Sequence, residues 1–120
     1  MKTNIIELIK SDLYRYHGHT SWLLFIKSLF ILKGFKFIFW LRLSKHYDKN
    51  FIVRWFPKLM YLYYKRVLVS DINYRAEIGP GFSMYHVFGT TFSDKVKLGK
   101  NNTILHGVTL GGVNDLYPTV

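Results

Sequence analysis

The sequence predicts an α+β protein in which N-terminal helices precede a parallel β-helix built from hexapeptide repeats. Residues 1–70 hold 13 Lys and Arg against 3 Asp and Glu, and they contain 16 of the 22 aromatic residues. Residues 71–120 hold four residues of each charge and repeat an apolar position every six residues. A fixed six-residue period with inward aliphatic side chains is typical of hexapeptide β-helices. We therefore expect a basic helical segment at 1–70 and about 2.4 coils of repeats at 71–120.

The stretch "NIIELIKSDLYRYHG", residues 4–18, predicts the first helix. Asn4 can cap its N-terminus, and Gly18 suits its end because glycine adopts the left-handed conformation at low cost. Between them apolar residues recur at helical spacing, at Ile5, Ile6, Leu8, Ile9 and Leu13.

The next stretch, "SWLLFIKSLFILKGFKFIFWLRL" at 21–43, is apolar enough to be compared with a membrane span. Its fourteen Leu, Ile and Phe residues contribute about −4 to −8 kcal/mol to insertion, and Lys33 and Lys36 near the middle cost about +5 to +7 kcal/mol. The sum of these insertion free energies is near zero, so the stretch is not expected to span a membrane. Two alternatives stay open: a helix packed in an oligomer with its lysine stems along apolar neighbours, or a peripheral helix attracted by anionic lipid.

Residues 51–69, "FIVRWFPKLMYLYYKRVLV", form a further aromatic and basic stretch in which Pro57 breaks or begins a helix. The aromatic residues lie in apolar runs and no nucleic-acid-binding motif is present, so we expect no nucleic-acid partner. The chain has no cysteine and therefore no disulfide or thiolate metal site. The N-terminus lacks the pattern of a signal peptide, which predicts a cytoplasmic location.

The hexapeptide blocks begin with "INYRAE", "IGPGFS" and "MYHVFG" and resume after Thr90 and Thr91. Their opening residues are Ile72, Ile78, Met84, Phe92, Leu98, Ile104 and Leu110. The fifth place of a block is also small or apolar, at Ala76, Phe82, Phe88, Val96 and Val108. We expect both sets to point inward; the alternative is a β-meander with chance spacing.

Residues 70–112, "SDINYRAEIGPGFSMYHVFGTTFSDKVKLGKNNTILHGVTLGG", resemble the serine acetyltransferase-like family of hexapeptide acyltransferases. "PTV" at 118–120 is similar to the opening of a further coil. "SDLYRY" at 11–16 and "FWLRLS" at 39–44 resemble, more loosely, the polysaccharide-biosynthesis branch. The resemblance implies a left-handed parallel β-helix, a homotrimer and acetyl-CoA as acyl donor. Because family members continue for several more coils, it also implies that the chain is incomplete at its C-terminus.

The resemblance assigns catalytic roles to His86 and Asp71, which stand at the family's separation of aspartate and histidine. Acetyl transfer to a hydroxyl needs a base, and imidazole, with an ordinary pKa of about 6.5, is suited to that role. The carboxylate would orient the ring and stabilise the imidazolium. Weaker candidates for binding the acceptor are His106 and Tyr85. Two-histidine metal spacing is absent around His86, so we expect no metal.

Three departures from the serine-specific pattern concern the acceptor. Tyr85 and Asn73 stand where those members carry an aspartate and a histidine, and Leu116 with Tyr117 replace an Arg-His pair before Pro118. A pocket without those charges favours a sugar hydroxyl of a surface polysaccharide over free serine. The alternatives are a serine O-acetyltransferase of cysteine biosynthesis, or a catalytically incomplete fragment that binds membrane or partner chains. The remaining histidines, His17, His19 and His46, are expected to be exposed and receive no role.

Overall fold

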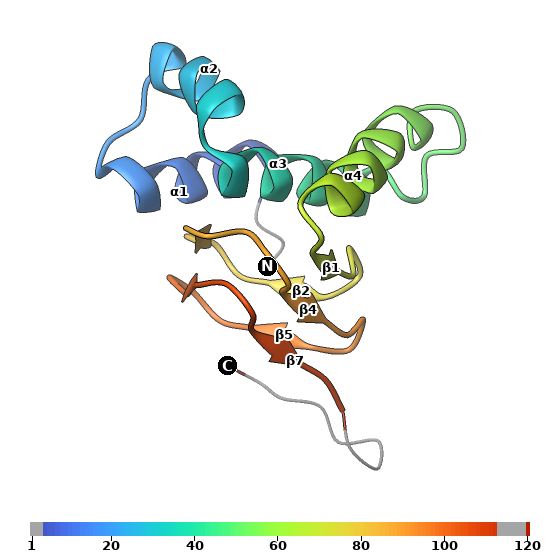
Figure 1. Ribbon diagram of the computed structural model, residues 1–120. Helices are drawn as coiled ribbons and strands as arrows, with labels where there is room; N and C mark the ends of the chain where they lie inside the picture. Colours follow the sequence, from blue (N-terminus) through green and yellow to red (C-terminus); the bar gives the residue numbers. More distant parts are fainter. Residues whose placement is uncertain (1–3, 113–119) are drawn as a thin grey trace.

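The computed structural model describes residues 4–112 and 120, and it consists of a helical layer placed at one end of a stack of short strands (Figure 1). The helices are α1 (Ile5–His17), α2 (Trp22–Ile31), α3 (Lys33–His46) and α4 (Trp55–Val67). The strands are β1 (Asp71–Ile72), β2 (Glu77–Ile78), β3 (Ser83–Met84), β4 (Thr91–Phe92), β5 (Lys97–Leu98), β6 (Thr103–Ile104) and β7 (Thr109–Leu110). This order confirms the predicted succession of helices and strands.

The strands pair in parallel and form three separate sheets, with orders β1-β4-β7, β2-β5 and β3-β6. Each strand therefore pairs with the strand three places away along the chain, as in a solenoid whose coil contains three strands. We call residues 71–90 the first coil. Ile72 lies opposite Phe92 and Phe92 lies opposite Leu110. The first of these separations is two residues longer because the turn at 85–90, before β4, is two residues longer than the turn at 105–108, before β7.

The six-residue period is explained by the strands, because each opening apolar residue is the second residue of a two-residue strand. Six of these seven side chains are buried and Leu110 is half-buried. Among the fifth-place residues, Ala76, Phe82 and Val96 are also buried. The expectation is wrong for Phe88, which is exposed, whereas Val87 is buried in its place. The turn that contains both residues, 85–90, is two residues longer than the turn at 105–108, so its side chains point in different directions.

The helices begin and end largely where local chemistry predicts. Asn4 accepts a hydrogen bond from the Ile6 N–H at 2.8 Å, and Gly18 adopts φ 77° at the end of α1. Pro57 lies in the first turn of α4, where its missing N–H costs no helical hydrogen bond. The stretch at 21–43 is divided into α2 and α3 by an extended residue, Leu32. No helix within residues 4–112 has both the length and the apolar character needed to cross a membrane.

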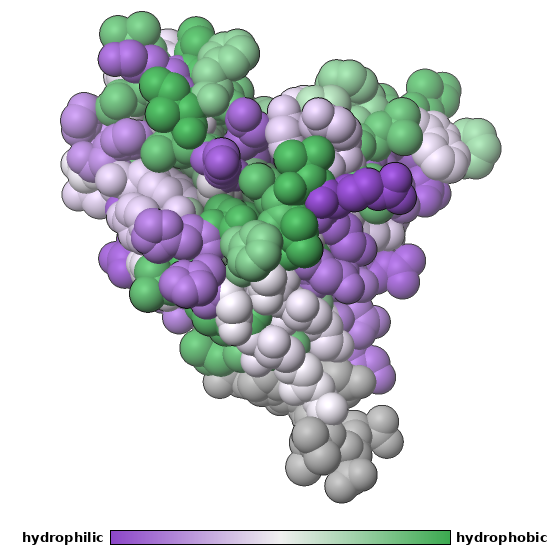
Figure 2. All heavy atoms as spheres, in the orientation of Figure 1, coloured by the Kyte–Doolittle hydropathy of each residue, from purple (hydrophilic) through white to green (hydrophobic). Residues whose placement is uncertain are grey.

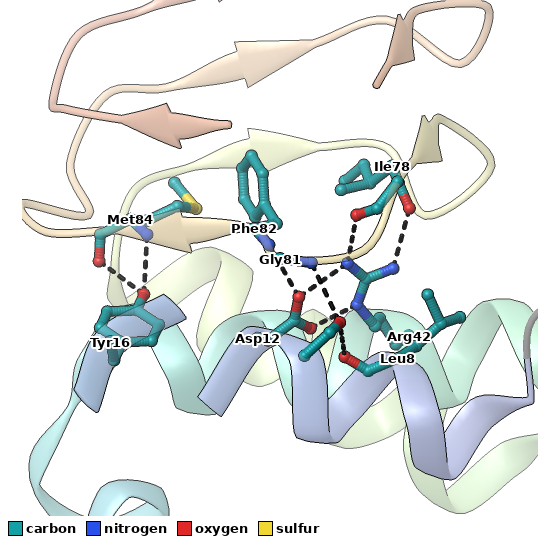
Figure 3. Close-up of polar contacts among 10 residues, drawn as sticks. Leu8, Asp12, Tyr16, Arg42, Ile78, Gly81, Phe82 and Met84 are labelled. Atoms are coloured by element: carbon teal, nitrogen blue, oxygen red, sulfur yellow. Dashed lines mark hydrogen bonds and ion pairs between the residues drawn. The ribbon is translucent and has the colours of Figure 1, made fainter. Parts of the chain in front are cut away.

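A buried ion pair joins the helical layer to the first coil (Figure 3). Arg42 of α3 donates to both carboxylate oxygens of Asp12 in α1, at 2.5 and 2.9 Å. The same guanidinium donates to the carbonyl oxygens of Ile78 and Gly79, at 2.9 and 2.8 Å. The Asp12 carboxylate in turn accepts the Phe82 N–H at 2.9 Å. We call Asp12, Arg42 and these backbone groups the docking clamp.

Further hydrogen bonds from the helices reinforce this contact. The Tyr16 hydroxyl accepts from the Met84 N–H at 2.7 Å and donates to the Met84 carbonyl at 2.8 Å, so that it pairs with a strand as another strand would. Ser11 Oγ accepts the Gly81 N–H at 3.0 Å, and the Tyr61 hydroxyl donates to the Ile72 carbonyl. Burial raises the pKa of Tyr16 and of Tyr61, so both hydroxyls remain protonated donors at neutral pH.

Gly34 allows α3 to approach β3 closely. A Cβ atom at this position would lie 2.0 Å from the Met84 carbonyl oxygen and 2.5 Å from the Tyr16 hydroxyl. Glycine in a helix is normally about 1 kcal/mol less favourable than alanine, but the contact reverses that preference. We expect Gly34→Ala to lower the free energy of unfolding by about 1–3 kcal/mol, measured by urea denaturation, because the helix must move away from the strand.

Gly111→Ala provides a matched control, since a Cβ atom there would have no neighbour within 4 Å. This variant should change the free energy of unfolding by less than about 0.5 kcal/mol. Equal or higher stability of Gly34→Ala would show that the approach of α3 to β3 does not depend on glycine.

Candidate functional site

His86 lies in the turn between β3 and β4, at a corner of the first coil. This turn returns alongside the start of the first coil, because the Gly89 N–H donates to the Val69 carbonyl and the Asp71 N–H to the Thr90 carbonyl, each at 2.8 Å. Buried Val87 and Thr90 fix the turn from within, while His86 is exposed. His86 therefore lies in the turn that closes the first coil, before the strand whose first residue, Thr91, lies opposite Asp71.

His106 occupies the equivalent turn of the next coil, between β6 and β7. The Gly107 N–H donates to the Phe88 carbonyl at 2.8 Å, which joins the two turns. The rings of His86 and His106 meet edge to face, with their centroids 5.9 Å apart and their planes at 79°. Two exposed imidazoles thus lie side by side at one corner, although sequence reasoning ranked His106 as the weaker candidate.

Asp71 makes a different contact from the one expected. Its Oδ1 atom accepts from Lys65 Nζ of α4 at 2.8 Å, in a pair whose two side chains are 65% and 34% exposed. Among the hydrogen bonds and ion pairs of the described residues, none joins Asp71 to His86. The catalytic dyad therefore stays a prediction, and the Asp71 carboxylate pairs with Lys65.

Tyr85 lies next to His86 and is half-exposed. Its ring packs edge to face against Tyr16 of α1 at 5.5 Å, and its N–H donates to the Ile104 carbonyl at 3.3 Å. The helical layer thus contributes an aromatic wall to this corner. Tyr85 and His106, the two candidates for acceptor binding, lie on either side of His86, and their roles are untested by this geometry.

The other histidines lie elsewhere. His19 and His46 are exposed, as expected. The expectation is wrong for His17, which is half-buried because its Nε2 atom shares a hydrogen bond of 2.8 Å with buried Ser28. Within residues 4–112 and 120, no group of three His, Asp or Glu residues is arranged to hold a metal ion.

A cavity of about 770 Å³ lies between α1, α3 and the turns at 73–80. Its lining includes Lys45, Lys49, Arg75 and Glu77, and none of the predicted catalytic residues. Burial lowers the pKa of Lys45, and the nearby Glu77 carboxylate opposes that shift. The cavity is therefore separate from the corner that holds His86. We take the corner as the candidate site because it holds the two adjacent imidazoles of His86 and His106, which do not line the cavity.

Comparisons with known proteins give matches among solved structures only. No protein-family model matches the chain, and no curated protein sequence matches it. Several solved structures that resemble it are serine acetyltransferases. The enzyme from Neisseria gonorrhoeae superposes with a TM-score of 0.76 at 26% identity, covering 98% of this chain. A structure of that enzyme in complex with serine gives a TM-score of 0.75 at 28% identity and the same coverage.

The serine acetyltransferase from Brucella abortus in complex with coenzyme A gives a TM-score of 0.73 at 25% identity over 93% of this chain. The chain covers 47%, 50% and 46%, respectively, of these three solved chains, or about half their length. The match includes the helical layer as well as the strands, because it extends over nearly all of this chain. No comparison supports the polysaccharide branch over the serine-specific enzymes.

Proposed function

We propose that the protein is an acetyl-CoA-dependent O-acetyltransferase of the hexapeptide type. The observation that carries this proposal is the agreement of helices and strands together with serine acetyltransferases, two of which are solved with serine and with coenzyme A. Its strands then belong to a left-handed β-helix, in line with the three sheets of parallel strands.

In the proposed reaction, a hydroxyl oxygen of the acceptor attacks the thioester carbonyl carbon while His86 takes the hydroxyl proton. The carbon–sulfur bond then breaks, and the imidazolium returns the proton to the departing thiolate. This leaves an acetyl ester and free thiol, so atoms and charge balance. Asp71 would orient the His86 ring. For that contact its carboxylate must turn from Lys65 or use its second oxygen, and its 65% exposure gives it room to do so.

For the acceptor we propose serine, since the comparisons favour it over the sugar that the sequence predicts. One feature of this chain keeps the sugar as a second candidate. The exposed residues next to His86 in its turn and in the adjoining turn include Tyr85, Phe88, Leu105 and His106, and none of these four carries a carboxylate to bind an ammonium group.

Two further proposals follow from the corner and from the resemblance. His86 is exposed in the single chain, which suits a site completed by a neighbouring chain in a homotrimer. A cytoplasmic location suits acetyl-CoA as the donor.

Calorimetry with coenzyme A and a thiol-release assay test the proposal together. We expect binding of coenzyme A and release of thiol from acetyl-CoA in the presence of serine. Turnover with methyl glycosides and not with serine would replace serine by a sugar as acceptor. Absence of coenzyme A binding would contradict the enzyme proposal and support the alternative of a catalytically incomplete fragment.

A further inference from the structure

Helix α2 exposes an apolar face instead of burying it. Trp22 and Phe30 are 82% and 78% exposed, and Leu23, Ile26 and Ile31 share the same outward side. The inward side carries buried Ser28, which bonds to His17. Helix α2 packs on α1 and α3 and contacts no strand of the described chain. The inward side is also apolar, because Phe25 packs edge to face against Phe35 and Phe39. Helix α2 is thus apolar on both sides, whereas a helix at the surface of a soluble protein normally has a polar outward side.

A second apolar surface begins in the turn before α4. Phe51 and Ile52 are 80% and 83% exposed at the tip of this turn. The outward side of α4 continues it with Trp55, Phe56, Leu59, Leu62, Tyr63 and Val67, all exposed. The inward side of α4 holds Pro57 and Tyr61, which are buried. As in α2, aromatic and aliphatic residues predominate among the outward-facing side chains.

Both surfaces belong to the helical layer, at the end of the molecule opposite the later strands (Figure 1). Figure 2 shows hydrophobic residues gathered on both upper lobes, over α2 and over the region of α4. We call the exposed apolar side chains of α2, of residues 51–53 and of α4 the apolar crest. Helices α2 and α4 do not contact each other, so the crest consists of two apolar patches on the helical layer. Exposed apolar patches of this kind mark binding surfaces for proteins or membranes.

The charges around the crest have one sign. Residues 13–70 contain eleven Lys and Arg residues and a single carboxylate, Asp48. That carboxylate already lies 4.0 Å from Arg54 and 3.6 Å from Lys58. Lys27 within α2 and Lys33 at the start of α3 are exposed. A partner for this surface must therefore supply both an apolar phase and negative charge.

A second copy of the chain supplies the apolar surface without the charge. Two crests placed face to face would bring cations together, and the single carboxylate of residues 13–70, Asp48, is already paired with Arg54 and Lys58. The surface of a bilayer containing anionic lipid supplies both requirements. Helix α2, with ten residues, is about 15 Å long, or half the thickness of the hydrocarbon core, which suits a position parallel to the surface. Tryptophan is also enriched at the membrane–water boundary.

We propose that the apolar crest binds the surface of a bilayer that contains anionic phospholipid, with α2 and residues 51–53 inserted among the headgroups. This proposal does not depend on the acetyltransferase activity, because vesicle binding is measured without turnover. If both hold, the binding would place the corner of His86 near membrane-bound acceptors.

Co-sedimentation of the full chain with vesicles tests the proposal. We expect binding to phosphatidylcholine vesicles that contain 25 mol% phosphatidylglycerol, about tenfold weaker binding to pure phosphatidylcholine, and partial release in high salt. Phe51→Ser with Ile52→Ser should weaken the binding by at least about tenfold. Lys27→Gln with Lys33→Gln should weaken binding to the anionic vesicles by about fivefold per charge.

Leu105→Ser is the matched control, because Leu105 is an exposed leucine outside the helical layer. This variant should bind the vesicles as the unchanged chain does. Circular dichroism of all variants establishes that each is folded. Failure of the unchanged chain to bind anionic vesicles overturns the proposal, as does equal binding to neutral and anionic vesicles. Sedimentation velocity that shows crest-dependent self-association without vesicle binding would assign the crest to a second copy.

Discussion

Replacing His86 with alanine will lower the turnover number for acetyl transfer by about 10²–10⁴-fold, the range that a general base contributes. The effect is expected because the acceptor hydroxyl must lose its proton as its oxygen bonds to the thioester carbon. Without the imidazole, water is left as the base. The thiol-release assay measures the rate, and calorimetry should show that affinity for coenzyme A changes little.

His106→Ala is the matched control, since its ring packs against that of His86 at 5.9 Å in the next coil. If His106 binds the acceptor, this variant will raise the KM for the acceptor more than it lowers the turnover number. A larger loss of turnover for His106→Ala than for His86→Ala would transfer the base role to His106. Full activity of His86→Ala would remove base catalysis by this residue from the proposal.

The strands were predictable because their pattern is local and repeats. Ile72, Phe92 and Leu110 lie opposite one another through two coils, as the six-residue period requires once the inserted threonines are allowed for. The prediction that Phe88 points inward was wrong, and Phe88 lies in the turn that contains the two extra residues. A two-residue extension changes which side chains of a turn point inward, and the sequence does not show in which of its residues the turn absorbs the change.

The break of the apolar stretch at Leu32 was not predictable from helix propensity. Apolar residues continue on both sides of it, and only Gly34 marks the region. The structure explains the break by tertiary contact. Just after the break, Gly34 places α3 against Met84 and Tyr16, residues distant from it in sequence. Contacts between residues this far apart in sequence override local preference.

The candidate site was predicted only in part, and the part that was predicted depends on the repeat. The six-residue period predicts that His86 lies in a turn after the third strand, and the structure has it there, between β3 and β4. The ion pair between Lys65 and Asp71 depends on how α4 enters the first strand, which no repeat encodes. The docking clamp was missed although its residues lie in "SDLYRY" and "FWLRLS". The available signal was a charged residue, Arg42, within an apolar stretch, where burial requires a partner such as Asp12.

Arg42→Met should lower the free energy of unfolding by about 3–5 kcal/mol, as expected when one partner of a buried ion pair is removed. The loss has two sources. Burial raises the pKa of the Asp12 carboxyl, and Arg42 is the main group opposing that shift, so the variant leaves a buried acid without its cation. The carbonyl oxygens of Ile78 and Gly79 also lose their donor. Urea denaturation followed by circular dichroism measures the change.

Lys58→Met is the control for removing a cation from a more exposed pair. Its amino group lies 3.6 Å from Asp48, with the two side chains 19% and 29% exposed, and its loss should cost about 0–1 kcal/mol. Equal losses for Arg42→Met and Lys58→Met would mean that the buried pair contributes no more than a surface pair.

The double variant Asp12→Leu with Arg42→Met separates the ion pair from the docking of the first coil. Replacing both partners of a buried pair by apolar residues is often neutral. Here we expect no full recovery, because the Phe82 N–H loses its acceptor and the carbonyls of Ile78 and Gly79 still lack a donor, each at a cost of about 1–3 kcal/mol. Recovery of the original stability would show that these backbone groups find other partners. In that case the pair would specify the position of the helical layer without contributing net stability.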